Sequence, residues 1–210
     1  MASLADLVLA GRRVRLEPLS LEHVAALVGA ASESRDTYRL TSVPDGAEAM
    51  GRYVQVALAE RDRGLSVPFA TVELARGAVV GSTRFMNIET WTWPSTERAR
   101  PVPSVPFEAA EIGSTWLAAS AQRTAVNTEA KLLMLTHAFE VWGLRRVNLK
   151  TDARNVRSRT AIERLGARHD GVLRAHMPAF DGGIRDTAVY SILASEWPAV
   201  KAALVARVER

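Results

Sequence analysis

The order of strand-like and helix-like segments after residue 108 restricts the fold more than any other feature of this sequence. Runs of β-favouring residues occur at 110–117, 145–151, 171–173 and 187–193, and helical periodicity covers 128–142 and 155–165. Gly143 and Gly166 follow the two helical segments, where glycine commonly ends a helix. Because strands and helices interleave, we predict an α+β (mixed α/β) fold in which helices flank one sheet.

The first half of the chain extends this pattern, with a half-buried strand predicted at 12–17 and helices predicted at 21–31 and 47–63. Two apolar runs flank the turn signal Arg76-Gly77, which predicts an antiparallel hairpin of residues 67–74 and 78–88. Residues 91–107 carry four prolines and no periodicity, so we expect a long loop there.

The chain ends in a further amphipathic segment. Residues 195–210 predict a last helix that either caps the fold or contacts a second subunit in a homodimer. We interpret residues 1–210 as one domain, with this helix as its C-terminal extension, because 210 residues of which 48% are hydrophobic suffice for one substantial core.

The composition excludes several classes of site. Cysteine is absent, which removes disulfides, thiolate nucleophiles and cysteine-ligated metals, and the four histidines lack the spacing of a metal motif. We therefore expect no metal. The net charge is +4, and the basic residues form no continuous block in the sequence, so nucleic-acid binding is disfavoured. Without a long apolar run or a signal-peptide pattern, the sequence predicts a cytoplasmic protein that does not enter the membrane.

The segment 119–127 carries the first indication of chemistry, because it joins a strand to a helix. Unpaired N–H groups and the helix dipole make such a helix start an anion site. Arg123 adds a positive charge, and Thr124 and Thr128 add hydroxyl donors. Polar strand-loop-helix joints are common, so the local chemistry alone leaves phosphate binding open.

Residues 111–191 also carry a series of motifs in a fixed order. The strand begins Glu-Ile-Gly at Glu111, the loop contains Gln122 and Arg123, and the helix contains Thr-Glu-Ala at 128–130. Further matches are Asn155, Ser158, Leu165-Gly166, Arg185-Asp186, Tyr190 and Ser191. With these motifs, residues 11–197 resemble the GNAT acetyltransferases, in particular the RimJ/RimL-like branch that acetylates protein N-termini.

This resemblance implies a GNAT-like fold with a central, mostly antiparallel, twisted sheet whose two central strands, 110–117 and 145–151, splay apart. It implies that acetyl-CoA lies between them and that a primary amine, on a protein N-terminus or a small molecule, attacks the thioester directly. The implied cofactor-binding residues are Trp116, Leu117, Gln122, Arg123, Thr124, Ala125, Val126, Asn127, Thr128 and Asn155. Ala125 and Asn127 occupy positions where the family pattern has glycine or a small residue, which restricts the approach of the backbone to the pyrophosphate.

The resemblance also suggests catalytic residues. Glu111 begins the strand that frames the slot, so we predict that it is the base, acting through a water; the alternative is a solvated carboxylate at a strand end. Ser158 and Asn155 correspond to residues near the thiol and the pantetheine, although both could simply cap a helix. In some relatives a glutamate serves as base at the position of Met177, and the neighbouring His176 is a substitute candidate.

Aromatic residues are candidates for the acceptor pocket, although aromatic side chains in a chain of this size also fill the core. The candidates are Trp91, Trp93, Tyr190 and Phe69. A different class of function also fits the altered loop and Met177: a protein that binds CoA as a sensor or scaffold without catalysing transfer.

Overall fold

The computed structural model describes residues 4–92 and 106–209. Over these residues one sheet contains eight strands in the order β1-β2-β3-β4-β5-β6-β8-β7. The strands are β1 (Leu9–Ala10), β2 (Val14–Pro18), β3 (Ser66–Glu73), β4 (Ala78–Glu89), β5 (Ala109–Leu117), β6 (Arg146–Asp152), β7 (Arg168–Pro178) and β8 (Ile184–Leu193). All neighbouring pairs are antiparallel except β5 and β6, which are parallel. The predicted mixed fold is confirmed.

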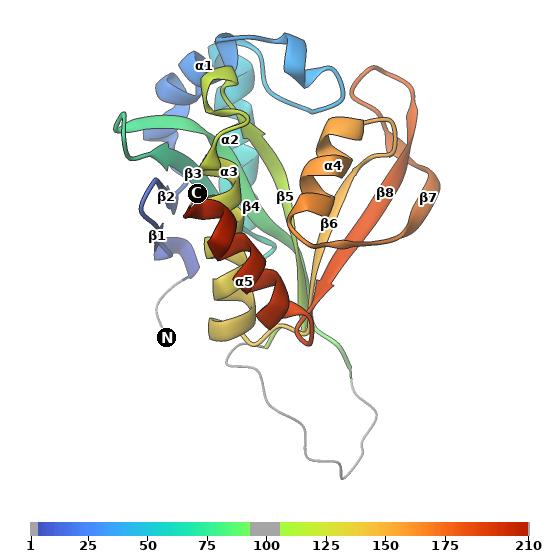
Figure 1. Cartoon of the computed structure of the whole chain (residues 1–210). Helices are drawn as coiled ribbons and strands as arrows, with labels where there is room; N and C mark the ends of the chain where they lie inside the picture. Colours follow the sequence, from blue (N-terminus) through green and yellow to red (C-terminus); the bar gives the residue numbers. More distant parts are fainter. Residues whose placement is uncertain (1–3, 93–105, 210) are drawn as a thin grey trace.

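Helices lie on both faces of this sheet, with α3, α4 and α5 in front of it and α1 and α2 behind it in Figure 1. The α-helices are α1 (Val24–Ser32), α2 (Gly46–Asp62), α3 (Ala125–Thr136), α4 (Val156–Arg164) and α5 (Trp197–Val208). Single turns occur at η1 (Leu4–Asp6), η2 (Leu21–His23), η3 (Asp36–Tyr38) and η4 (Ala119–Ala121), and the π turn η5 (His137–Val141) extends α3. Among the described residues, no helix is long and apolar enough to cross a membrane.

The core is continuous from β2 to α5. Its centre contains an aromatic series in which the ring centroids of Phe69 and Phe85 are 6.2 Å apart and those of Phe85 and Trp142 are 4.5 Å apart. Trp197 of α5 stacks on Phe139 at 5.3 Å. The last helix therefore caps the fold, one of the two predicted alternatives; a subunit contact stays a prediction.

Glu129 of α3 fixes this helix to the start of β2. Its buried carboxylate accepts hydrogen bonds from the backbone N–H groups of Arg12 (3.0 Å), Arg13 (2.7 Å) and Val14 (2.8 Å). A Cβ on Gly11 would come within 2.6 Å of the Glu129 carboxyl carbon, which explains the glycine there. Buried N–H groups need partners, and Glu129 supplies the acceptor that these three N–H groups would otherwise lack.

Most predicted elements agree with the observed ones to within a few residues, but the strand predicted at 171–173 extends over Arg168–Pro178, β1 was not predicted, and α3 begins earlier than expected. The helix was predicted from residue 128 but begins at Ala125, after Thr124, whose side chain accepts a hydrogen bond from the Val126 N–H. Threonine is a good N-cap residue, and this signal was available in the sequence. Gly143 and Gly166 have φ values of 71° and 95°, so both end helices as predicted.

Candidate active site

The parallel pair β5 and β6 diverges after a short contact. The two strands pair only at Ala109 with Arg146, Ala110 with Val147 and Glu111 with Asn148. Beyond Glu111, β5 continues against β4 and β6 continues against β8. Ser114, at a register shift between β4 and β5, has a φ of 49°. We call this divergence the fork; it confirms the predicted splay and is visible in Figure 1.

The two faces of β6 lead to different sides of the fork, because side chains alternate along a strand. Leu149 pairs with Tyr190, whose hydroxyl accepts from Arg159 Nε (2.9 Å) and donates to Glu163 Oε1 (3.0 Å) of α4. This face is therefore covered by α4. Asn148, Lys150 and Asp152 point to the opposite face, the side of α1 and α2.

Glu111 lies at the point where the fork begins, and its side chain is buried. Lys150 Nζ is 2.9 Å from Glu111 Oε2, and Asn87 Nδ2 donates to the same oxygen at 2.8 Å. The alternative of a solvated surface carboxylate is wrong. No sequence pattern indicated Lys150 or Asn87, because only the register of three strands brings them to Glu111.

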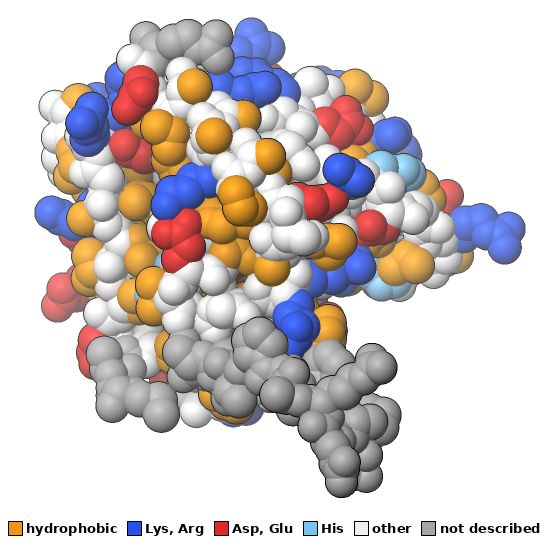
Figure 2. Space-filling model, turned by 60° about the horizontal axis from the view of Figure 1, so that its bottom comes forward, with side chains coloured by type: hydrophobic (Ala, Val, Ile, Leu, Met, Phe, Trp, Pro, Cys, Tyr) orange, Lys and Arg blue, Asp and Glu red, His pale blue; other side chains and the backbone are white. Residues whose placement is uncertain are grey.

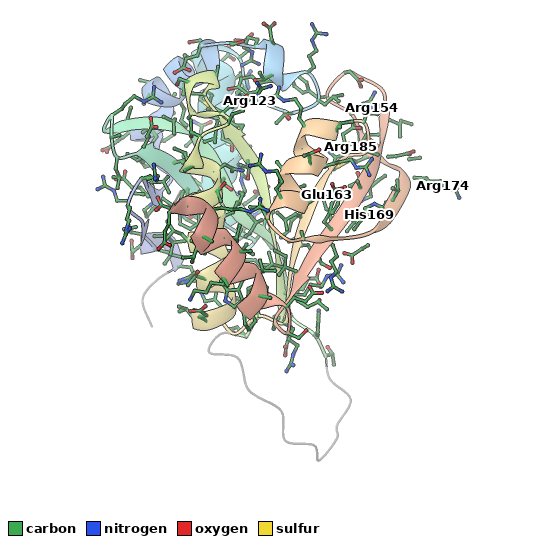
Figure 3. The ribbon with its side chains drawn as sticks, in the orientation of Figure 1. Arg123, Arg154, Glu163, His169, Arg174 and Arg185 are labelled. Atoms are coloured by element: carbon green, nitrogen blue, oxygen red, sulfur yellow. The ribbon has the colours of Figure 1, made fainter. Side chains whose placement is uncertain are left out.

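The predicted anion site lies at the start of α3, beside the end of β5. Arg123 has a φ of 61°, whereas Ala125 and Asn127 lie within α3, where neither residue needs a left-handed backbone. The expected restriction at Ala125 and Asn127 therefore comes from their Cβ atoms alone. The side chain of Arg123 lies above α3 on one side of the fork, opposite Arg154 and Arg185 (Figure 3).

A pocket of about 350 Å³ adjoins this helix start. It is lined by Arg12, Arg13, Glu73, Leu74, Ala75, Thr124, Ala125 and Val126. Arg12, Arg13 and the dipole of α3 favour an anion, and Glu73 is already paired with Arg76. The groups present fit a phosphate-bearing ligand.

Gln122 connects three elements around the fork. Its Nε2 donates to Thr37 Oγ1 and to the Leu117 carbonyl, both at 2.9 Å, and its Oε1 accepts from Arg157 of α4 at 2.9 Å. Tyr38 donates a second hydrogen bond to the Leu117 carbonyl at 2.7 Å. The segment around η3 is thereby tied to the end of β5.

The β5 side of the fork contains an unsatisfied donor. Trp116 is buried, and its Nε1–H has no hydrogen-bond partner among the described residues. A buried donor of this kind costs stability unless a ligand or water pairs with it. Trp116 was predicted to contact the cofactor through its backbone; the unpaired indole N–H is a further group that could bind a ligand.

On the β6 side, Asn155 caps α4, since its Oδ1 accepts from the Ser158 N–H at 3.0 Å. The capping interpretation of Asn155 is thus confirmed, and it leaves the side-chain amide and the partly exposed Ser158 hydroxyl for other contacts. Thr128 and Asn127 lie in the first turn of α3, partly exposed.

Two of the aromatic candidates for an acceptor pocket are enclosed in the core. Trp91 is exposed and donates to Glu89 Oε2 at 3.1 Å, and Trp93 lies outside the described residues. Phe69 and Tyr190 are fully buried in the core. The enclosed position of Tyr190 gives no support for its assignment to a pocket; burial also raises the pKa of its hydroxyl.

His176 and Met177 lie at an irregularity in β7. The register with β8 shifts between Leu173 and Met177, and Ala175 has a φ of 47°. The exposed His176 places Nδ1 3.0 Å from Thr187 Oγ1. Simple strand alternation therefore fails here, because a bulge changes the direction of the side chains.

Charged side chains of both signs are mixed with apolar ones over the face in Figure 2, and no single positive field covers that face. Among the described residues, no group of three or more histidine, aspartate or glutamate side chains could hold a metal ion.

Comparison with known proteins gives a consistent result. Residues 13–168 match the family model described as an acetyltransferase (GNAT) domain. A GCN5-related N-acetyltransferase from Brucella melitensis is 31% identical, with a TM-score of 0.82 over 97% of this chain and 86% of that chain. No curated protein sequence matches.

Two less similar structures share the fold. RimJ from Mycobacterium smegmatis, solved with CoA-disulfide, is 22% identical, with a TM-score of 0.76 over 99% of this chain and 97% of that one. A ribosomal-protein-S5-alanine acetyltransferase from Vibrio fischeri is 15% identical, with a TM-score of 0.68 over 91% and 99% of the two chains.

Proposed function

This chain belongs to the GNAT acetyltransferase family, and from that membership we propose that it transfers the acetyl group of acetyl-CoA to a primary amine by direct attack in a ternary complex. The observation that carries the proposal is the fork, with an anion-binding helix start beside one strand and a buried, paired carboxylate where the strands part.

The residues around the fork divide into those that would bind the cofactor and those that would take part in catalysis. Arg123 and the first turn of α3 would hold the pyrophosphate, Trp116 and Leu117 would hold the pantetheine arm, and Asn155 would contact the arm from the other side. Acetyl-CoA supplies the activated acyl group. A backbone N–H of β5 would stabilise the negative charge that develops on the thioester oxygen.

Glu111 is the proposed base. Lys150 and Asn87 hold its carboxylate in one place, and it would accept the proton of the acceptor ammonium through a water molecule. Ser158, at the start of α4, would donate its proton to the departing thiolate and take up the proton that the acetylated nitrogen releases, so that its hydroxyl is restored. The side of the fork occupied by Glu111 is the side away from α4, so the acceptor would approach from there.

The test measures cofactor affinity and turnover separately. Arg123→Glu reverses a charge beside the phosphates and should raise the Kd for acetyl-CoA about tenfold or more. Glu111→Gln should lower kcat about a hundredfold, while the Kd for acetyl-CoA stays within about twofold. Arg63→Glu, at the exposed end of α2, is the control. Unchanged affinity in Arg123→Glu, or full turnover in Glu111→Gln, would contradict the assigned roles.

The choice between a protein N-terminus and a small amine, and the alternative of a sensor without catalysis, need one further measurement. Release of CoA thiol with a panel of amines and peptides, beside calorimetric titration of acetyl-CoA, distinguishes them. Binding of acetyl-CoA without thiol release on any acceptor would favour the sensor. The fold shared with RimJ and with the S5-alanine acetyltransferase supports including N-terminal peptides in the panel.

A further inference from the structure

A second pocket, of about 410 Å³, lies on the side of the fork away from α4. It is formed by the segment after η3, the end of β6, and the β7–β8 hairpin, and its lining includes Leu40, Asp152, Met177, Phe180 and Arg185. Its volume falls within the range of small-molecule sites, about 300–1,000 Å³.

The pocket adjoins the proposed reaction centre. Asp152 shares a face of β6 with Lys150, the partner of Glu111, and the rise of about 3.3 Å per residue places their Cα atoms roughly 7 Å apart. The Asp152 carbonyl also accepts the Asn155 N–H at 2.9 Å, so α4 begins directly after the end of β6 that lines the pocket. A group held at Asp152 would therefore lie two residues along β6 from the lysine that pairs with Glu111.

Asp152 is an ionised carboxylate with spare capacity to accept hydrogen bonds. It is 3% exposed, and hydrogen bonds from Arg154 lower its pKa, so it is charged at neutral pH. Arg154 donates its N–H and Nε to Oδ1 and its Nη2 to Oδ2. A carboxylate offers about four acceptor positions, so one position on Oδ2 remains for a ligand.

Arg185 supplies the opposite charge at the same pocket. Its Nε donates to Thr187 Oγ1 at 2.9 Å, which fixes the guanidinium and leaves the terminal nitrogens to contact a ligand. The pocket therefore presents one anion and one cation, a pairing that suits a ligand with an ammonium and a nearby carbonyl or carboxylate oxygen.

The remaining wall is apolar. Met177 and Phe180 are 43% and 54% exposed, and with Leu40 they form an apolar surface beside the two charges. Apolar side chains gathered at the surface of a soluble protein commonly mark a ligand contact. Met177 cannot act as a base, but its side chain forms part of the apolar lining of the pocket.

We propose that this pocket binds an α-amino acid unit with an apolar side chain, with its ammonium at Asp152, its carbonyl oxygen at Arg185 and its side chain against Leu40, Met177 and Phe180. This inference rests on the proposed amine acetylation. A free amino acid and the first residue of a peptide share this chemistry, so the test includes both.

The first experiment compares acceptors by release of CoA thiol: L-leucinamide, L-leucine, a leucyl tripeptide, glycinamide, and isoamylamine, which is leucine without its carboxyl group. We expect kcat/KM for leucinamide to exceed that for glycinamide and for isoamylamine about tenfold each. Turnover of leucine above the tripeptide assigns the free amino acid, and the reverse assigns the peptide. Equal or better turnover of glycinamide or isoamylamine overturns the proposal.

The second experiment uses matched variants. Asp152→Asn should raise KM for leucinamide about tenfold with the Kd for acetyl-CoA unchanged, whereas Asp181→Asn, which also removes a partner of Arg154 but does not line the pocket, should not. Met177→Ala with Phe180→Ala should abolish the preference for leucinamide over glycinamide. Ile184→Ala, on the same hairpin outside the pocket, should keep it. Equal effects in variants and controls overturn the proposal.

A direct titration separates this inference from the proposed function. Leucinamide is titrated calorimetrically into the protein saturated with CoA. If no amine releases thiol but leucinamide binds and Asp152→Asn removes the binding, the proposed transfer fails and the pocket assignment stands. If amines are acetylated but Asp152→Asn and Asp181→Asn bind leucinamide equally, the pocket assignment fails and the transfer stands.

Discussion

The two strands that form the fork are supported in different ways. β5 lies against α3, whose buried polar side chains fix the helix to the sheet: Glu129 binds the start of β2, and Lys131 Nζ lies 2.6 Å from Thr115 Oγ1 of β5. β6 pairs with β8, and β8 pairs with β7 at the edge of the sheet. Every residue of β7 is exposed except Gly171, which is partly exposed.

This difference corresponds to the two proposed tasks of the fork, which are binding the cofactor and binding the acceptor. The β5 side, where we propose that the cofactor binds, depends on buried contacts, and changing them costs stability. The side of β6, β8 and β7, where we propose that the acceptor binds, depends on a hairpin whose side chains can vary at little cost, because few of them are buried. A family with one cofactor and different acceptors is expected to place its variable residues on the second side.

The sharpest way to break this comparison is Glu129→Ala, which should have the largest effect. It removes the partner of three backbone N–H groups, each costing about 1–3 kcal/mol when left unpaired in a buried site. We expect urea denaturation to show a loss of about 3 kcal/mol or more in the free energy of unfolding. Glu22→Ala, at an exposed position of η2, serves as the control. A loss under about 1 kcal/mol would mean that α3 is held by other contacts.

Lys131 gives an intermediate and pH-dependent effect. It is 3% exposed, bonds only to Thr83 and Thr115 among the described residues, and burial lowers its pKa to about 7. Between pH 7 and about 10 the unfolded chain binds this proton and the folded chain does not, so the wild-type protein gains stability as pH rises.

In Lys131→Met this gain should disappear, a change of up to ~1.4 kcal/mol per pH unit over that window. Thermal unfolding of both proteins at several pH values measures it. Lys201→Met removes an exposed lysine paired with Glu140 and should leave the pH dependence in place. A constant difference between wild type and Lys131→Met across the window would refute the buried titration.

The smallest effect is expected on the acceptor side. Val172→Ser, at an exposed position of β7, should change the free energy of unfolding by no more than about 0.5 kcal/mol. Val147→Ser, at a fully buried position of β6, is the matched comparison and should cost several times more. Equal losses in the two variants would show that β7 is covered by a partner in solution.

The Thr-Glu-Ala motif was interpreted through the family resemblance as part of the cofactor-binding helix start. No role was predicted for its glutamate, and the structure shows that the Glu129 carboxylate accepts hydrogen bonds at the start of β2. Asn155 was predicted as a possible cap and caps α4, whereas Thr124 was predicted as a hydroxyl donor to a phosphate and caps α3. Local hydrogen bonds of this kind depend on a few neighbouring residues, which is why the sequence predicts them.

Glu111 shows the opposite case. The sequence singled it out through the motif at the start of β5, but its environment, solvated or buried, stayed open. Its partners Lys150 and Asn87 come from β6 and β4. Neither pairing follows from spacing along the chain, because a shift of one residue in either register would turn the side chain to the other face.

The sequence by itself determined the order of the elements, the ends of most helices and the family, because these depend on local periodicity, caps and linear motifs. Only the tertiary structure decided where β5 and β6 part, that the buried Lys131 bonds to two threonine hydroxyls, and that Asp152, Arg185 and Phe180 line one pocket. These features join residues far apart in the chain, and strand register and the bulge in β7 fix them.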